Sequence, residues 1–214
     1  YLLCSATVQD LLRQCPQRER FAEQFAVQLN DTHPTMAVPE LIRILTSEGM
    51  DFEQAAEIAF RAFSFTNHTV MPEALECWSE SLMRAVAPEL IPIIRRLDER
   101  LRAQGHEGLY IVENHSIHMA NLAVACTHCT NGVAELHTHI LKERVFADWH
   151  RAYPDRLQNV TNGITPRRWL GVCNPELTAL LSDTLGGDDF LTDLARLGAL
   201  REHLDDALID RFMA

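Results

Sequence analysis

The chain has 214 residues, of which 47% are hydrophobic and 23% are charged, as in a globular protein with one large domain or two small ones. Its 19 basic and 30 acidic residues give a formal net charge of −11. This charge argues against nucleic acid or a membrane as the main partner, because both need a cationic protein face. The sequence also lacks an apolar run near the roughly 20 residues of a membrane span, so we expect a cytoplasmic enzyme or binding domain.

The first third of the chain predicts helices around one strand. The alternating residues 25–29 indicate the strand, which leads into a polar loop at Asn30–Pro34. In open α/β sheets, ligands bind in loops that follow the carboxyl ends of strands. The expected helices cover residues 6–12, residues 39–45 with Pro39 in the first turn, and residues 52–63 with Asp51 as the cap.

The middle of the chain contains a polar loop at residues 66–71, after which Pro72 is typical of a helix start. Glu73 and Glu76 would then lie on one helix face, and a retaining glycosidase needs two carboxylates about 5 Å apart. Acidic residues in a first turn are also favoured by the helix dipole, which is the commoner reason for such a pair. Further along, we expect a helix over 88–104, a strand or helix over 119–126, and a helix over 133–142.

Towards the C-terminus, residues 157–161 predict a short strand, and Thr165 and Pro166 predict the cap and first position of a helix. The segment from residue 171 onward is strongly acidic, with nine acidic residues and three arginines. Because the character of the chain changes after the Thr165–Pro166 helix start, we place a domain boundary between residues 160 and 165. Trp78 and Trp169 are interpreted as core residues.

Six cysteines include one pair with suggestive spacing, Cys126 and Cys129. A lone CxxC is weak evidence for a zinc site, because such a site needs about four ligands. The nearest other candidates, His137 and His139, would point about 200° apart on a helix and could not bind one ion together. We favour buried, reduced thiols and keep a small metal-binding domain as the alternative.

Three polar loops, at residues 30–34, 66–69 and 161–165, each precede an expected helix and are rich in Asn, Asp, His and Thr. They carry none of the signatures of serine nucleophiles, P-loops or dinucleotide sites. Amide and imidazole groups offer donors and acceptors at fixed angles, which suits a ligand made of hydroxyls, namely a sugar. The competing interpretation is that these residues only form turns and helix caps.

Four motifs in order, at residues 28–41, 66–76, 131–134 and 161–169, closely resemble the glycogen, starch and maltodextrin phosphorylases. The resemblance covers the whole chain and about a middle quarter of that family's chain. It implies a helix-rich α/β fold with a partial, nucleotide-fold-like parallel sheet and the start of a second such domain. Residues 1–160 would be the end of the N-terminal domain, and residues 161–214 the beginning of the C-terminal, cofactor-bearing domain.

The resemblance also implies an activity and a site. The family phosphorolyses terminal α-1,4 bonds of an α-glucan with orthophosphate and releases glucose 1-phosphate, and we expect a homodimer when the protein is intact. His68 would be the catalytic histidine, which contacts the sugar 6-hydroxyl through its side chain and the anomeric region through its backbone. Asn162 would reach the 4- and 6-hydroxyls. The other expected pocket residues are Asp31, His33, Glu73, Ala74, Glu76 and Thr130, the last at a position where the family usually has Val.

The family's cofactor is pyridoxal phosphate, whose phosphate group relays the proton. The cofactor lysine would lie in the later part of the C-terminal domain, and Lys142, the single lysine here, does not match its motif. We therefore expect this segment alone to bind no pyridoxal phosphate and to turn over no glucan. The alternative is a free-standing carbohydrate-binding or regulatory module without catalysis.

Overall fold

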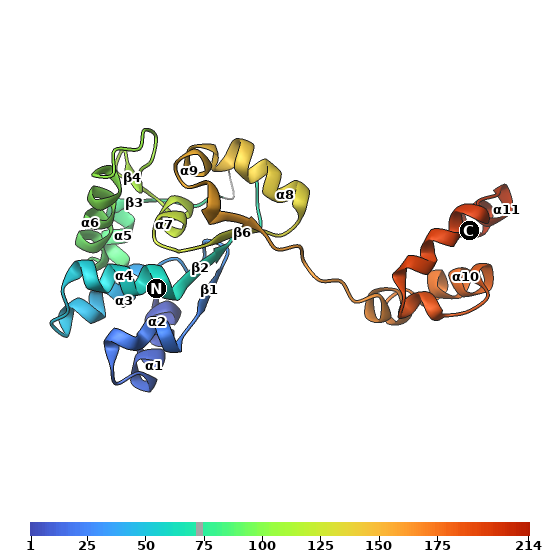
Figure 1. Cartoon of the computed structure of the whole chain (residues 1–214), viewed down its shortest axis with the longest axis horizontal. Helices are drawn as coiled ribbons and strands as arrows, with labels where there is room; N and C mark the ends of the chain where they lie inside the picture. Colours follow the sequence, from blue (N-terminus) through green and yellow to red (C-terminus); the bar gives the residue numbers. More distant parts are fainter. Residues whose placement is uncertain (72–74) are drawn as a thin grey trace. The chain divides into compact units, whose positions relative to one another are not determined.

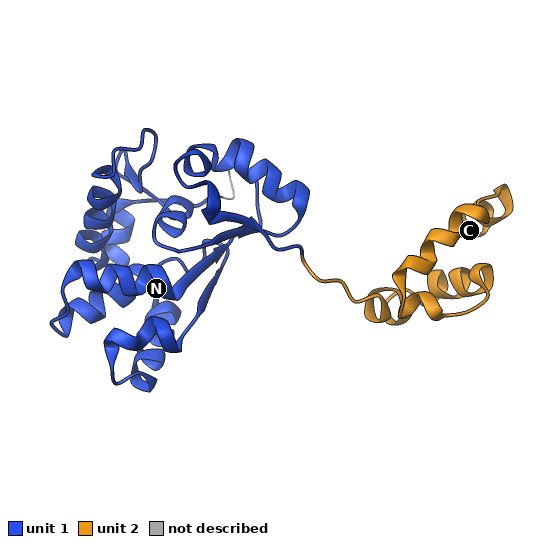
Figure 2. Ribbon diagram, viewed as in Figure 1, with its two compact units in different colours: residues 1–161 blue, residues 162–214 orange. Residues whose placement is uncertain are grey.

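A computed structural model describes residues 1–71 and 75–214 and shows two compact units, Tyr1–Thr161 and Asn162–Ala214 (Figure 2). The boundary between the two units, after Thr161, falls inside the predicted interval 160–165. Unit 1 is an α/β unit with many helices, and unit 2 consists of helical elements. The expected helix-rich α/β class is therefore confirmed.

Unit 1 is organised around a parallel sheet with strand order β1-β2-β6-β7 (Figure 1). Its strands are β1 (Val27–Asn30), β2 (Phe63–Thr66), β6 (Thr130–Gly132) and β7 (Leu157–Asn159). Asn30 pairs with Thr66, Thr66 pairs with Asn131, and Gly132 pairs with Asn159. Because the strands are parallel and end in register, the loops that follow them start at the same edge of the sheet.

A second, antiparallel sheet of unit 1 has the order β3-β5-β4, with strands β3 (Cys77–Ser79), β4 (Val112–Glu113) and β5 (Ser116–His118). The helices of unit 1 are α1 (Leu2–Gln14), α2 (Phe21–Gln24), α3 (Ala37–Ser47), α4 (Phe52–Ala62), α5 (Glu80–Val86), α6 (Leu90–Arg102), α7 (Met119–Ala125), α8 (Glu135–Ile140) and α9 (Ala147–Ala152). The π-helical turn Leu141–Val145 joins α8 to α9. Unit 2 contains a π-helical turn (Arg167–Val172), α10 (Pro175–Leu185), a 3-10 segment (Leu194–Glu202) and α11 (Asp206–Met213).

The core of unit 1 forms where amphipathic helices pack against the parallel sheet. In α3, Val38, Leu41, Ile42 and Leu45 are fully buried at helical spacing, as expected for a helix with one apolar face. Asp51 caps α4 as the sequence predicts, because its carboxylate accepts a hydrogen bond of 2.9 Å from the Glu53 amide. In the chain, α3 follows β1 after the loop at residues 31–36.

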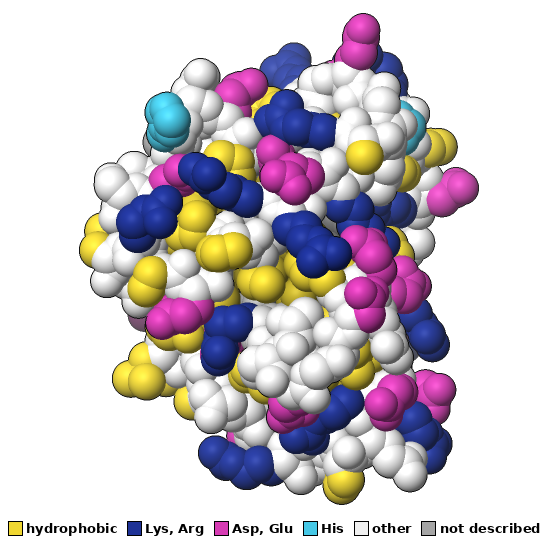
Figure 3. All heavy atoms as spheres, turned by 90° about the vertical axis from the view of Figure 1, so that its left-hand side faces the viewer, with side chains coloured by type: hydrophobic (Ala, Val, Ile, Leu, Met, Phe, Trp, Pro, Cys, Tyr) yellow, Lys and Arg dark blue, Asp and Glu magenta, His cyan; other side chains and the backbone are white. Residues whose placement is uncertain are grey.

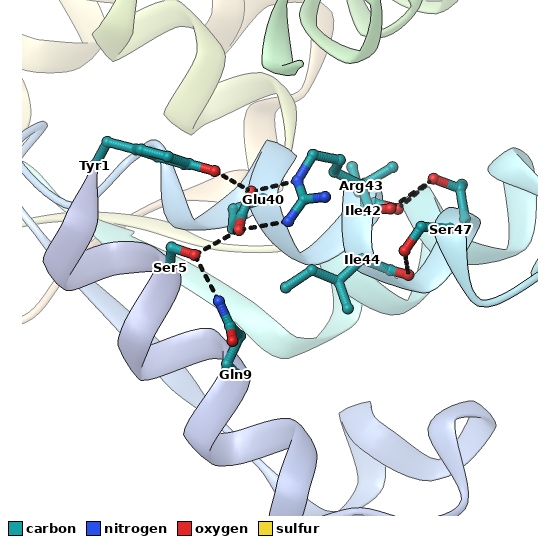
Figure 4. Close-up of polar contacts among 9 residues, drawn as sticks. Tyr1, Ser5, Gln9, Glu40, Ile42, Arg43, Ile44 and Ser47 are labelled. Atoms are coloured by element: carbon teal, nitrogen blue, oxygen red, sulfur yellow. Dashed lines mark hydrogen bonds and ion pairs between the residues drawn. The ribbon is translucent and has the colours of Figure 1, made fainter. Parts of the chain in front are cut away.

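A buried carboxylate ties α1 to α3 (Figure 4). Glu40 is 0% exposed and accepts hydrogen bonds from Arg43 Nε at 2.8 Å and Arg43 Nη2 at 2.9 Å. Ser5 Oγ donates to it at 2.6 Å and the Tyr1 hydroxyl at 3.2 Å. Burial raises the pKa of Glu40, but the hydrogen bonds from Arg43, Ser5 and Tyr1 and the charge of Arg43 act the other way, so the net pKa lies below its ordinary value. The carboxylate is therefore charged at neutral pH.

The segment after the residue 66–71 loop differs from the helix expected to begin at Pro72. Residues 72–74 lie outside the described residues, Leu75 and Glu76 are not helical, and Cys77–Ser79 form β3 against β5. Within the described residues after the gap, a helix begins after Ser79, whose hydroxyl accepts a hydrogen bond from the Leu82 amide and caps α5. The expectation of a shared helix face for Glu73 and Glu76 is therefore wrong at Glu76.

For residues 119–126, which could be a strand or a helix by length, the structure shows a helix, α7. Two other local expectations change. Thr165 precedes the helical turn at Pro166, but no side-chain cap is formed there, and Thr165 contributes its backbone carbonyl instead. Trp78 and Trp169 are 40% and 58% exposed, so interpreting them as core residues is wrong, whereas Trp149 is 3% exposed.

Charge is dispersed over the surface of the face in Figure 3, where basic and acidic side chains lie interspersed and hydrophobic atoms show between them. Such alternation produces no strong field of one sign over that face. Among the described residues, none of the helices combines the length and the apolar character needed to cross a bilayer.

Candidate functional site

The candidate site lies at the carboxyl edge of the parallel sheet, where polar loops follow each strand. The loop after β1 begins at Asp31, the loop after β2 at Asn67, and the segment after β6 at Val133. The strand register brings these three starts next to one another. This is the place where open parallel sheets bind ligands.

Asp31 turns the chain at the end of β1 with an unusual backbone. Its φ of 65° is in the left-handed region, which a side chain other than glycine seldom adopts. Its amide donates to the Thr66 carbonyl at 2.9 Å, and its carboxylate accepts from the Thr32 amide at 2.8 Å. The Thr32 hydroxyl then donates to the Glu76 carboxylate at 2.7 Å, so Asp31 and Glu76 are connected through one buried threonine.

The loop after β2 presents His68 to solvent above the end of β1. His68 is exposed, and its Nε2 lies 2.5 Å from Asn30 Oδ1. Because Oδ1 can only accept, Nε2 is the donor, and in the neutral ring Nδ1 is then an acceptor. The neighbouring Asn67 is buried. Its backbone N–H donates to the backbone carbonyl of Asn131 at 3.0 Å, and its side-chain Oδ1 accepts from the backbone N–H of Thr69 at 3.1 Å.

A row of side-chain hydrogen bonds crosses three strands just before these loops. Gln28 Nε2 donates to Thr66 Oγ1 at 2.8 Å, and Thr66 Oγ1 donates to Asn131 Oδ1 at 2.8 Å. The Asn131 amide donates to the Gly132 carbonyl at 3.0 Å. Each polar group restrains the next, so the row fixes the edge of the sheet as one rigid polar platform.

The segment after β6 turns tightly into α8. A Cβ at Gly132 would lie 2.4 Å from Thr138 Oγ1 and 3.0 Å from Thr138 Cα, so only glycine fits there. The single proton of the Thr138 hydroxyl has two acceptors within reach, Asn159 Oδ1 at 3.0 Å and the Ala134 carbonyl at 2.9 Å. The Val133 backbone amide donates to His137 Nδ1 at 3.0 Å. These bonds hold α8 against the ends of β6 and β7.

The structure brings several expected site residues to this edge. Asp31, His68 and Glu76 belong to the hydrogen-bonded loops described above. His33 is exposed and shares with Glu76 a cavity of about 270 Å³. The rest of that cavity is lined by Thr32, Met36, Trp78, Leu82, Met83, Val86 and Met119.

Other expected residues lie elsewhere or are not covered. Thr130 is buried at the start of β6, in register with Phe65 and Leu157. Glu73 and Ala74 lie outside the described residues. Asn162 is exposed at the first position of unit 2, and its meeting with His68 around one sugar stays a prediction.

Sequence reasoning missed some residues that shape the site: Asn30, Thr32, Asn67 and Gln28. They belong to the same motifs, but their roles follow from strand register and burial. Together the loops offer amide, imidazole, hydroxyl and carboxylate groups at fixed positions, which suits recognition of several hydroxyls.

Of the two thiols in the CxxC segment, Cys126 is buried as expected, whereas Cys129 is only half-buried. Burial raises the pKa of Cys126 to about 12, so its thiol is protonated at neutral pH. Within residues 1–71 and 75–214, no three His, Cys, Asp or Glu side chains come together as a metal site would need.

Comparison with known proteins complements this geometry. The model of the carbohydrate phosphorylase family matches residues 1–214. The wheat (Triticum aestivum) alpha-glucan phosphorylase H isozyme is 41% identical over 96% of this chain and 28% of its own length. The cytosolic alpha-glucan phosphorylase 2 of Arabidopsis thaliana is 40% identical over 96% of this chain and 27% of its own length. The human (Homo sapiens) muscle glycogen phosphorylase is 39% identical over the full chain and 28% of its own length, so the chain spans little more than a quarter of these relatives.

Proposed function

The chain belongs to the carbohydrate phosphorylase family, and from this premise we propose that it supplies one wall of the sugar site of an α-glucan phosphorylase. The intact enzyme would cleave terminal α-1,4-glucosidic bonds with orthophosphate and release glucose 1-phosphate. The observation that carries the proposal is that the loops beginning at Asp31 and Asn67 and the polar end of β6 at Asn131 meet at one carboxyl edge. A glucose ring presents hydroxyls around its rim, and this edge presents matching donors and acceptors.

His68 has the geometry for a direct role in the proposed site. The bond to Asn30 fixes its ring, which leaves Nδ1 free to accept a hydrogen bond from a sugar hydroxyl. Because the imidazole is already held in place, it can position the sugar ring without a further loss of side-chain entropy during the reaction. Asp31 and Glu76, held together through Thr32, would support the side of the pocket near the anomeric carbon.

The residues present do not fit a pyridoxal phosphate site. A phosphorylated cofactor needs a lysine together with several phosphate donors. Lys142, the only lysine of the chain, lies in the Leu141–Val145 turn and has no hydrogen bond or ion pair with a residue that the structure describes. We propose that the cofactor is held by protein outside this chain, and we assign no step of the reaction to it here.

The proposal is tested by phosphorolysis in the whole protein that carries this chain. The substitution His68→Ala should lower kcat by about 100-fold and change KM by less than about threefold, because a contact that strengthens in the transition state is lost. His203→Ala is the matched control, since His203 is exposed in unit 2. Small and equal effects of His68→Ala on kcat and KM would show that His68 only packs its loop.

The chain alone gives a second test. One wall of a sugar site should bind maltose only in the millimolar range or more weakly, and the chain should produce no glucose 1-phosphate. Micromolar binding by the isolated chain would favour the carbohydrate-binding module instead. Pyridoxal absorbance that borohydride fixes onto Lys142 would contradict the assignment of the cofactor to another part of the protein.

A further inference from the structure

A second cavity of unit 1, of about 250 Å³, is bordered by residues that precede strands of the parallel sheet. Phe60 lies shortly before β2, Cys126 shortly before β6, and Arg156 directly before β7. The candidate sugar site is built instead from residues at the ends of the strands and in the loops that follow them. None of the residues assigned to that site lines this cavity, so the two are separate.

Most of the wall of this cavity is apolar. The buried side chains that line it come from α3, α4, α6 and the end of α7 (Figure 1): Ile42, Ala56, Leu97, Leu101 and Cys126. The rings of Phe60 and Tyr153 add aromatic surface. A small inorganic anion would leave this wall without a partner, so a ligand that fits needs an apolar body.

The guanidinium of Arg156 adds a positive charge to the apolar wall. Its Cζ lies 5.0 Å from the centroid of the Phe60 ring and 4.7 Å from that of Tyr153. Nη2 has three backbone carbonyls within reach at the end of α7, those of Val124 at 2.5 Å, Thr127 at 2.6 Å and Ala125 at 3.3 Å. The helix dipole favours a cation at this place, so these contacts explain how Nη2 is held.

The contacts of Nη2 leave the rest of the guanidinium without a protein partner. Nε and Nη1 of Arg156 form no hydrogen bond with a residue that the structure describes, and no described Asp or Glu forms an ion pair with it. Glu57, the acidic residue of the lining, is exposed. Burial lowers the pKa of Arg156, because its charge is partly removed from water. An anion in the cavity would compensate this half-buried charge.

We propose that this cavity binds a small organic carboxylate with a flat, apolar body. The carboxylate would accept hydrogen bonds from the unpartnered N–H groups of Arg156, and bonds between two charged groups are the strong ones. The body would pack against the apolar wall. Arg100 lines the same cavity and adds a second positive charge, although it also pairs with Glu53 at 3.2 Å. This inference does not depend on the proposed function.

Cinnamate is the probe for the test, because it joins a carboxylate to a flat aromatic body. Isothermal titration calorimetry on the whole protein measures its Kd beside two controls: cinnamamide, which has the same body without charge, and inorganic phosphate, which has charge without the body. Cinnamate should bind about tenfold more tightly than either control. Absent binding of cinnamate, or equal affinities for cinnamate and cinnamamide, would overturn the proposal.

A charge placed at the rim shows whether cinnamate binds in this cavity. Gln104 is exposed and lines the cavity, and its side-chain oxygen accepts a hydrogen bond from the Tyr153 hydroxyl. Gln104→Glu keeps that acceptor, adds a negative charge and should weaken cinnamate about fivefold, with cinnamamide changed by less than about twofold. Gln54→Glu is the matched control, since Gln54 is exposed on α4 and does not line the cavity. Equal cinnamate affinities in the two variants would refute the assignment.

Removal of the guanidinium gives the second test. Arg156→Gln should abolish the preference of the protein for cinnamate over cinnamamide. Because this variant also loses the contacts with α7, its fold is checked by circular dichroism, and Gln104→Glu decides the question if the variant unfolds. A folded Arg156→Gln protein that keeps the tenfold preference would overturn the role of Arg156.

Discussion

The buried carboxylate of Glu40 offers the sharpest test of how unit 1 is held together. The substitution Glu40→Gln keeps the shape of the side chain but removes its charge and places an amide donor opposite the donors of Arg43. Glu40 is 0% exposed and receives four hydrogen bonds, two of them from Arg43. Removing one partner of a fully buried pair costs about 3–5 kcal/mol, and the partial exposure of Arg43 lets water compensate some of that loss. We expect a loss of about 2–4 kcal/mol in the free energy of unfolding.

Glu48→Gln is the matched control. Glu48 also pairs with an arginine in a two-pronged arrangement, at 2.7 Å and 3.1 Å to Arg18, but its side chain is 41% exposed. Exposed pairs contribute about 0–1 kcal/mol, so this control should lose less than about 1 kcal/mol. Burial, and not the number of bonds to arginine, then explains the difference between the two variants.

Urea unfolding at pH 7 measures both values, with the fluorescence of Trp149 as the probe in a background where Trp78 and Trp169 are Phe. Trp149 is buried in unit 1, so its signal follows that unit. With a slope of about 2 kcal/mol/M, Glu40→Gln should shift the midpoint by about 1–2 M.

The pH dependence checks the same reasoning. The folded-state pKa of Glu40 lies below its ordinary value of 4.5, so its contribution to stability is fully present above pH 4.5 and is lost as the pH falls through the folded value. The difference in unfolding free energy between parent and Glu40→Gln should therefore be constant above about pH 5.5 and should decrease as the pH falls below about 4.5. Equal urea midpoints for Glu40→Gln and Glu48→Gln would refute this explanation. So would a stability difference between parent and Glu40→Gln that does not change with pH.

Further predictions concern the backbone of the site and the thiols. Gly132→Ala should destabilise unit 1 by about 1–3 kcal/mol in urea unfolding, because its Cβ would overlap α8, whereas Gly163→Ala, with open space around its Cβ, should be nearly neutral. Asp31→Ala should cost about 1 kcal/mol more than Asp31→Gly, since only glycine relieves the left-handed backbone, and equal urea midpoints would argue against strain there. In native protein at pH 8, iodoacetamide should label the exposed Cys173 and spare Cys126 until urea unfolds the chain; mass spectrometry after brief labelling reads both sites.

The sequence predicts elements well where a local pattern repeats. The alternation at residues 25–29 leads to β1, the apolar spacing of residues 39–45 leads to α3, and Asp51 caps α4. The strands β2 and β6 are missed, because β2 continues directly from a helix and β6 is a three-residue strand that ends in glycine. Both owe their conformation to pairing with distant strands, which a local window does not contain.

The candidate site shows the same division. The polar loops at residues 30–34 and 66–69 are visible in the sequence, and the motifs relate them to a sugar site. Their connections are not visible, since the Gln28–Thr66–Asn131 row needs the strand register. The Thr32–Glu76 bond similarly needs the fold around Glu76, which is directly followed by strand β3 and not by helix.

The strand order has a consequence for how the protein is made. β1 and β2 pair across a short stretch of chain, so the Asn30–His68 half of the edge can assemble soon after both strands leave the ribosome. Asn131 joins only when β6 pairs with β2. This pairing closes a longer stretch of chain, which contains the whole antiparallel sheet. Nascent chains stalled between β2 and β6 would therefore carry half of the polar platform with an open β2 edge, and an unpaired strand edge of this kind is a template for aggregation.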